Sequence, residues 1–202
     1  MSGIGLVLVV VWVVLVAGVR GVIQYRRTGH PALRVADPPG SAQWWSRVVS
    51  SLGLLLAIAA PIAQLAGLAP IPALDRPELR AVGFVLYAAG IAITLASQAT
   101  MGASWRGDVD PEARTELVTT GPFRLVRNPI LTGTATTVLG LALVTPNLLS
   151  VAMLVCIFIA MQIQVRRVEE PYLLRVHGES YRRYAERTGR FLPLIGRLPA
   201  DP

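Results

Sequence analysis

Residues 119–131, TTGPFRLVRNPIL, open one apolar segment, and residues 168–184, VEEPYLLRVHGESYRRY, follow the next apolar segment along the chain. Two glutamates of the second stretch, Glu169 and Glu170, come directly after a run of residues that is apolar enough to enter a bilayer. A charged side chain at that depth is costly, so ionisable residues beside a membrane span often have a function. The two stretches therefore indicate a polar site at one end of a set of membrane helices.

The composition predicts an integral membrane protein. Hydrophobic residues make up 53% of the 202 residues, charged residues only 15%, and the mean hydropathy is +0.54. An ordinary soluble domain carries more charge, and its apolar residues are spread in short periodic stripes. Here they form five long blocks, at residues 3–19, 48–69, 82–99, 130–144 and 148–165.

The lengths of these blocks predict the fold class. A helix that crosses the hydrocarbon core needs about 20 apolar residues, and about 17 at the low end. The first three blocks are long enough, whereas the last two are short and are separated by Pro146 and Asn147, which predicts a helical hairpin. We expect an all-α integral membrane bundle of about five transmembrane helices, with residues 1–202 forming a single membrane domain.

The distribution of arginine predicts the orientation in the membrane. The chain has no lysine, and five spans would place seventeen of its 19 arginines on one side and only Arg76 and Arg80 on the other. Cytoplasmic loops carry the excess of positive charge. We therefore expect a multi-pass protein with its N-terminus outside and its C-terminus in the cytoplasm.

The same arginines bear on possible partners. A pI of about 10.7 also suits nucleic-acid binding, but the arginines are spread over three membrane-flanking loops and no soluble domain is evident to carry a groove. Anionic headgroups of the bilayer are the expected partner. The lone Cys156 and the distant His30 and His177 offer no metal-ligand cluster, so no metal is predicted.

The start of the fourth span has the features of an anion site. Asn128 followed by Pro129 is typical of a helix start, because asparagine caps free N–H groups and proline is tolerated at the first helical position. The positive end of the helix dipole would then lie beside Arg124 and Arg127. The alternative is that these residues only cap the helix and anchor it among the headgroups.

The segment after the fifth span predicts a cover for that site. Arg166 lies three and four residues before Glu169 and Glu170, a spacing that allows ion pairs on one helix face. Pro171 is expected to kink or restart the helix, and the amphipathic segment from Tyr172 onwards to lie along the membrane surface over the glutamates. We expect a cytoplasmic C-terminal helical cap. The alternative is an interfacial ladder of ion pairs that contributes little.

The two blocks LVTTGPFRLVRNPILTG and EEPYLLRVHGESYRRYAERTGRFLP, about forty positions apart, resemble the isoprenylcysteine carboxyl methyltransferase family, which is related to the phospholipid methyltransferases. The resemblance covers about residues 101–193, so it implies a methyltransferase core there. It also implies S-adenosylmethionine as cofactor, held by the extended segment before the Gly-Pro turn, the aromatic after it, the start of the next helix and the first glutamate. These positions are Thr115, Glu116, Leu117, Val118, Phe123, Arg127, Asn128, Pro129, Ile130, Leu131 and Glu169.

Two departures from the family pattern affect the chemistry. Asn128 replaces the usual histidine, so contacts that need an imidazole proton are lost. Val165 replaces the arginine that holds the prenylcysteine carboxylate, so a different acceptor or pose is expected. The catalytic candidates are Glu170, as general base for a protonated acceptor, and Arg166, the cation next to Val165.

The predicted function is an S-adenosylmethionine-dependent methyltransferase that acts on a lipophilic or amphipathic acceptor at the cytoplasmic membrane face. Methyl transfer mainly requires alignment of nucleophile, methyl carbon and sulfur, which fits a site without metal or covalent residue. Two alternatives remain open at this stage. One is a membrane reductase of the sterol-reductase type, and the other is a non-enzymatic membrane binding protein whose pocket has decayed.

Overall fold

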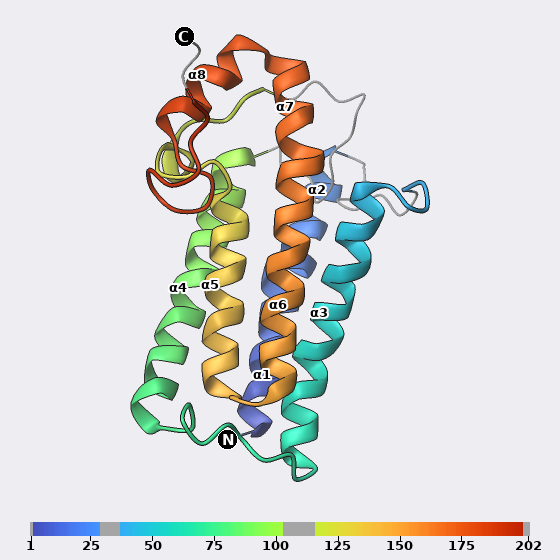
Figure 1. The fold of residues 1–202 in the computed structure, drawn as a ribbon, viewed down its shortest axis with the longest axis vertical. Helices are drawn as coiled ribbons and strands as arrows, with labels where there is room; N and C mark the ends of the chain where they lie inside the picture. Colours follow the sequence, from blue (N-terminus) through green and yellow to red (C-terminus); the bar gives the residue numbers. More distant parts are fainter. Residues whose placement is uncertain (1, 29–36, 103–115, 200–202) are drawn as a thin grey trace.

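A computed structural model describes residues 2–28, 37–102 and 116–199 of the chain. The described residues form an all-α bundle, as predicted, and show two isolated bridges but no strand (Figure 1). The elements are α1 (Ser2–Trp12), η1 (Val13–Val19), α2 (Arg20–Thr28), α3 (Ala42–Leu65), α4 (Pro77–Met101), η3 (Gly121–Arg124), α5 (Pro129–Val144), α6 (Leu148–Ile163), η4 (Gln164–Glu169), α7 (Glu170–His177) and α8 (Glu179–Arg187).

The apolar blocks of the sequence became the long helices, because only helices satisfy all backbone hydrogen bonds within one segment of a bilayer. Four stretches of the described chain are long and apolar enough to cross a membrane: Gly3–Ile23, Ala42–Leu65, Pro77–Met101 and Leu148–His177. The fourth predicted block, residues 130–144, is the shorter apolar helix Pro129–Val144. It forms the predicted hairpin with α6, where the side chain of Asn147 caps α6 by accepting from the Ser150 N–H.

Helices α4 and α5 pack backbone to backbone through small residues. A Cβ atom built on Gly140 would lie 2.5 Å from the Gly83 carbonyl oxygen, and one built on Gly133 would lie 2.7 Å from the Gly90 carbonyl oxygen. Glycines that allow two membrane helices to approach this closely gain van der Waals contact along the whole interface. The α4–α5 pair therefore forms a closely packed half of the bundle.

Helix α6 packs against α5 on one side and against α3 on the other, and α1 packs against α3. Ser46 donates to the Ala160 carbonyl at 3.1 Å, and Asn147 donates to the Ala60 carbonyl at 3.0 Å, so polar side chains of the interface are satisfied. A cluster of buried apolar residues joins the helices: Val9, Ala57, Val138, Leu141, Ala142 and Met153.

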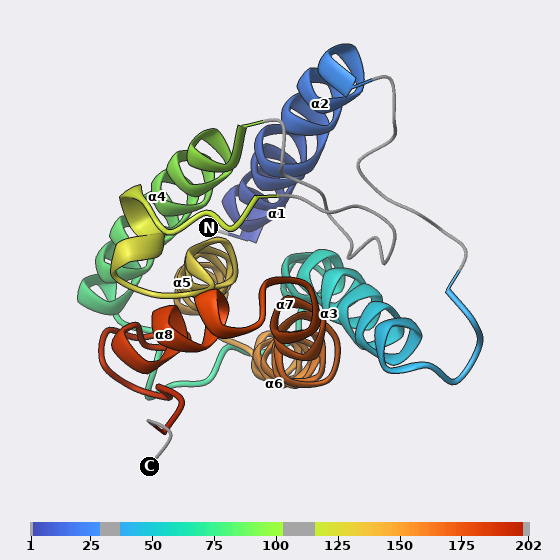
Figure 2. The ribbon, with the colours of Figure 1, turned by 90° about the horizontal axis from the view of Figure 1, so that it is seen from above.

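Different segments of the chain lie at the two ends of the bundle (Figure 1). At one end the α3–α4 connection meets the α5–α6 turn, where the Ile71 N–H donates to the Pro146 carbonyl at 2.7 Å, and the N-terminus lies at the same end. At the other end α7 continues the line of α6, and α8 and the C-terminal segment lie against the start of α5 (Figures 1 and 2). The candidate site lies at this second, covered end.

Candidate functional site

The helix that carries the two glutamates contains a π-helical segment that ends at the first of them, Glu169. Helix α6 passes into the π-helix η4, and the Glu170 N–H donates to the carbonyl of Val165, five residues earlier. A π-turn accommodates Pro171, which has no N–H and whose ring would collide with a carbonyl in a regular α-helix. The helix therefore continues through Pro171 to His177.

This continuity corrects the expectation of a surface helix from Tyr172 onwards. The chain turns instead at Gly178, whose φ of 51° lies in the left-handed region that favours glycine. The amphipathic covering helix is α8, which begins at Glu179 and crosses the end of the bundle (Figure 2). Pro171 does not turn the chain onto the membrane surface as expected, because the wider π-turn before it leaves room for the proline ring.

Glu170 is held by two arginines that are far from it in sequence. Arg127 Nη2 donates to Oε1 at 2.6 Å, while Arg190 donates from Nε to Oε1 at 2.8 Å and from Nη2 to Oε2 at 2.9 Å. Both carboxylate oxygens thus accept charge-assisted hydrogen bonds. The predicted pairing with Arg166 is not observed, because Arg166 donates to Gln162 at 2.8 Å instead.

The side chain of Arg127 is buried and joins several segments of the chain, so its charge is not exposed to solvent. It is only 1% exposed, and besides Glu170 it donates to the carbonyls of Ala185, Thr188 and Gly196 at 2.9, 2.6 and 3.1 Å. These bonds tie α8 and the C-terminal segment to the start of α5. The expectation that the charge of Arg127 contributes to an anion site is therefore corrected, since its guanidinium already faces one carboxylate and three carbonyls.

Asn128 occupies the predicted N-cap position of α5, followed by Pro129 in its first turn. Its side chain makes no cap hydrogen bond and donates instead to the Arg190 carbonyl at 3.1 Å. The N–H groups of Arg127 and Asn128 donate to the carbonyls of Gly189 and Arg190, at 2.8 and 3.1 Å. The predicted start of α5 is correct. The predicted capping role of the Asn128 side chain is wrong, because the C-terminal segment lies against Asn128 and accepts its hydrogen bond.

Glu169 has a different environment from its neighbour. It is partly buried at the end of η4, and its Oε1 accepts a hydrogen bond from the neutral amide of Gln164 at 3.2 Å. Glu170 is neutralised by two arginines, whereas this described partner of Glu169 carries no charge. The two adjacent carboxylates therefore lie in different surroundings: Glu170 joins α7 to the start of α5 and to the C-terminal segment, whereas the described partner of Glu169 is a neutral amide.

The other predicted cofactor residues lie at the same end of the bundle, with one outside the described chain. Thr115 falls in residues 103–115, which the structure does not describe. The non-helical segment at 116–120 carries Glu116, exposed, and Leu117 and Val118, partly buried. The remaining residues follow in η3 and the first turn of α5: Phe123 and Pro129, both buried, and Ile130 and Leu131, partly buried.

Three residues that sequence reasoning left out complete this end of the bundle. The Tyr184 hydroxyl donates to the Phe123 carbonyl at 2.6 Å, which ties α8 to η3. Tyr181 is 1% exposed, and burial raises its pKa to about 12, so its hydroxyl stays protonated at neutral pH. The spacing of Gly178, Tyr181 and Tyr184, three residues apart in each step, is the sequence signal that could have identified both tyrosines. Arg190, whose pKa is raised by its hydrogen bonds to Glu170, gave no sequence signal among many surface arginines.

The phospholipid methyltransferase family model matches residues 79–180, from the first turns of α4 to the start of α8. No curated protein shows a significant match to the chain. The matched stretch contains Arg127, Glu169 and Glu170, and it excludes α1, α2, α3 and Arg190.

Proposed function

The chain belongs to the phospholipid methyltransferase family, and on that premise we propose that this membrane methyltransferase uses S-adenosylmethionine and methylates a lipophilic or amphipathic acceptor at the cytoplasmic face. The observation that carries the proposal is the contrast between Glu170, locked by two arginines, and Glu169, which accepts from a neutral amide. The family match does not favour the reductase alternative.

The donor set at this end of the bundle is compatible with the proposed cofactor. S-adenosylmethionine carries a sulfonium and an ammonium, for which the carboxylate of Glu169 is a suitable partner. The N–H groups in the first turn of a helix have no intrahelical acceptor, so those of Ile130 and Leu131 suit the methionine carboxylate. When bound, the sulfonium supplies the electrophilic methyl group.

We assign the polypeptide the task of alignment. Holding the nucleophile and the electrophile in a reactive geometry contributes several kcal/mol to catalysis, about 7–11 for well-oriented intramolecular reactions. Glu170 acts as a positioning residue, because the arginines that bond both its oxygens oppose the uptake of a proton as general base. Arg166, an exposed residue of η4, is the proposed cation on the acceptor side.

The proposed core extends over residues 101–193 within a single membrane domain of residues 1–202. Support comes from the hydrogen bonds that join α5 to the C-terminal segment, such as Thr132 Oγ1 to the Phe191 carbonyl at 2.8 Å. Support for one domain comes from α3, which packs on α6 through Ser46 and Gly53.

Glu169→Ala is expected to weaken binding of S-adenosylmethionine by about 1.5–3 kcal/mol, the usual contribution of a hydrogen bond to a charged group. The variant removes the carboxylate that would face the cation or ribose hydroxyls of the cofactor. Isothermal titration calorimetry of the purified protein, with the cofactor and with S-adenosylhomocysteine, measures the loss. Glu186→Ala on α8 is the control and should bind like the wild type. Equal affinities for wild type and Glu169→Ala would remove Glu169 from the site.

The orientation proposed from the arginine distribution has its own test. Asp75 lies in the α3–α4 connection, at the end of the bundle away from α8. Cysteine labelling in intact cells should therefore modify a cysteine at Asp75 from outside, and cysteines at Asp108 and Asp201 only after permeabilisation. Asp108 and Asp201 fall outside the described residues, so the labelling rests on sequence alone for them. Equal access to Asp75 and Asp108 would contradict a third span.

A further inference from the structure

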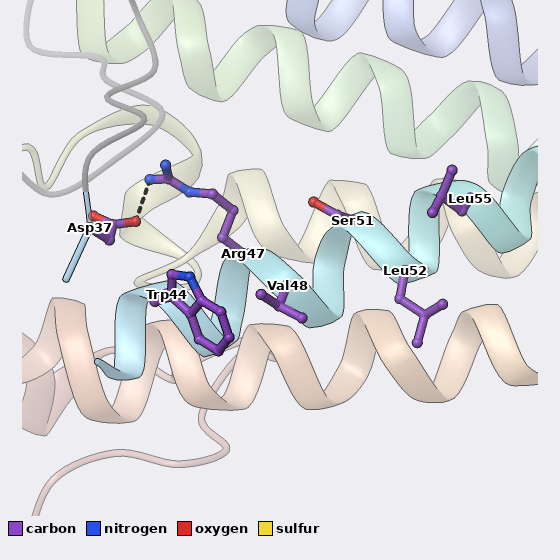
Figure 3. A pocket seen from close by; sticks show the side chains of 7 residues that line it. All are labelled: Asp37, Trp44, Arg47, Val48, Ser51, Leu52 and Leu55. Atoms are coloured by element: carbon purple, nitrogen blue, oxygen red, sulfur yellow. Dashed lines mark ion pairs between the residues drawn. The ribbon is translucent and has the colours of Figure 1, made fainter. Parts of the chain in front are cut away.

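Helix α3 carries an open groove that none of the predicted site residues lines. Its volume is about 510 Å³. It lies between Asp37 and one face of the first half of α3 (Figure 3). The lining residues are Asp37, Trp44, Arg47, Val48, Ser51, Leu52 and Leu55. All of them precede residue 79, so the groove belongs to the part of the chain outside the family match.

The spacing of the helical lining residues places them on a single face of α3. They recur at intervals of three and four positions, which is the repeat of one side of an α-helix. The opposite face is already used, since Ser46 bonds the Ala160 carbonyl and Gly53 packs against Ile157 of α6. Because α3 is apolar and long enough to span a membrane, the groove faces the lipid side of the helix.

The groove is polar at one end and apolar at the other. Asp37, Trp44 and Arg47 lie at the start of the helix, and Val48, Leu52 and Leu55 continue along it (Figure 3). At 1.5 Å per residue, the step from residue 47 to residue 55 covers about 12 Å along the helix axis. Tryptophan at the polar end is typical of headgroup depth. A ligand that matches this lining is itself amphipathic.

The polar end carries both signs of charge. Arg47 Nη2 lies 2.6 Å from Asp37 Oδ2, with side chains 29% and 12% exposed, so the charged part of the lining is neutral overall. An anionic headgroup would meet Asp37 as well as Arg47. A zwitterionic headgroup offers an anionic phosphate to the guanidinium and an ammonium to the carboxylate. Trp44 adds an aromatic surface, to which quaternary ammonium groups bind.

We propose that this groove binds one zwitterionic phospholipid of the surrounding bilayer. The phosphate lies at Arg47, the ammonium lies between Asp37 and Trp44, and an acyl chain follows Val48, Leu52 and Leu55. The site is separate from the methyltransferase site and does not depend on its activity. It gives α3 a role that the family core does not have.

Lipid retention tests the proposal. The protein is reconstituted in bilayers with equal amounts of phosphatidylcholine and phosphatidylglycerol of the same chain length, extracted into mild detergent and examined by native mass spectrometry. Phosphatidylcholine accepts no further methyl group, so retention is independent of turnover. We expect one retained phosphatidylcholine per wild-type chain and about tenfold weaker retention by Arg47→Gln, the change that one charge-assisted hydrogen bond carries.

The chain offers a matched control for this variant. Arg80 also pairs with an aspartate, Asp75, but at the other end of the bundle and away from the groove, so Arg80→Gln should retain lipid like the wild type. Ser51→Phe fills the groove without removing a charge and should also weaken retention by at least tenfold. Preference for phosphatidylglycerol, equal retention of both lipids, or full retention by Ser51→Phe would each overturn the proposal. Calorimetry with the cofactor remains a separate test of the methyltransferase site.

Discussion

Replacing Glu170 by alanine is expected to destabilise the protein by about 3–5 kcal/mol, the range for breaking a buried ion pair and leaving one charge unpaired. The guanidinium of Arg127, 1% exposed, would lose its only described carboxylate, and Arg190 would lose both of its described hydrogen bonds to that group. Thermal unfolding of the purified protein in detergent should show this loss as a drop in Tm of about 2–4 °C per kcal/mol.

Glu179→Ala is the matched control for this prediction. Glu179 also faces two arginines, Arg182 and Arg183, but its side chain is 59% exposed. Exposed pairs at this helical spacing contribute only about 0.3–0.5 kcal/mol, so the variant should be close to neutral. Similar Tm values for Glu170→Ala and Glu179→Ala would show that the buried cluster does not hold the fold together.

Glu170→Gln separates a positioning role from a general base. If Glu170 positions the C-terminal segment through Arg190, the amide variant should lower stability and cofactor affinity together with turnover. A general base acts only in the chemical step, so its loss would lower turnover while affinity and Tm stay unchanged. That second pattern would return Glu170 to the catalytic role that the sequence suggested.

Substituting Gly140 is the other change with a large expected effect. A Cβ at this position would lie 2.5 Å from both the Gly83 carbonyl oxygen and the Tyr87 backbone nitrogen, and these are backbone atoms that cannot rotate away. Overpacking of this kind costs about 1–3 kcal/mol for one added group. We expect that loss for Gly140→Ala, and for Gly140→Leu a failure to accumulate as a monodisperse protein in size-exclusion chromatography.

Gly3→Ala and Gly3→Leu are the matched controls, because Gly3 is also helical but nothing lies within 4 Å of a Cβ built there. Alanine favours a helix over glycine by about 1 kcal/mol in either place. The controls should therefore be neutral or slightly stabilising. A monodisperse Gly140→Leu protein with the Tm of the wild type would show that α4 and α5 need not approach so closely.

The local properties of the sequence determined the class of fold and the place of the candidate site. Long apolar blocks must become helices in a bilayer, because no water is present to satisfy a free backbone group. Pro146 and Asn147 predicted the hairpin between α5 and α6, and Asn128 with Pro129 predicted the start of α5. The order of the two polar blocks also indicated the methyltransferase family, which the match to residues 79–180 confirms.

Only the tertiary structure decided which groups pair with one another. The i, i+4 rule assigned Arg166 to Glu170, but it assumes a regular helix, and the π-turn at Gln164–Glu169 changes the direction in which each later side chain leaves the axis. The true partners, Arg127 and Arg190, lie 43 and 20 positions away in the chain. Their pairing depends on the return of the C-terminal segment across the start of α5, and no periodic pattern in the sequence encodes contacts of that range.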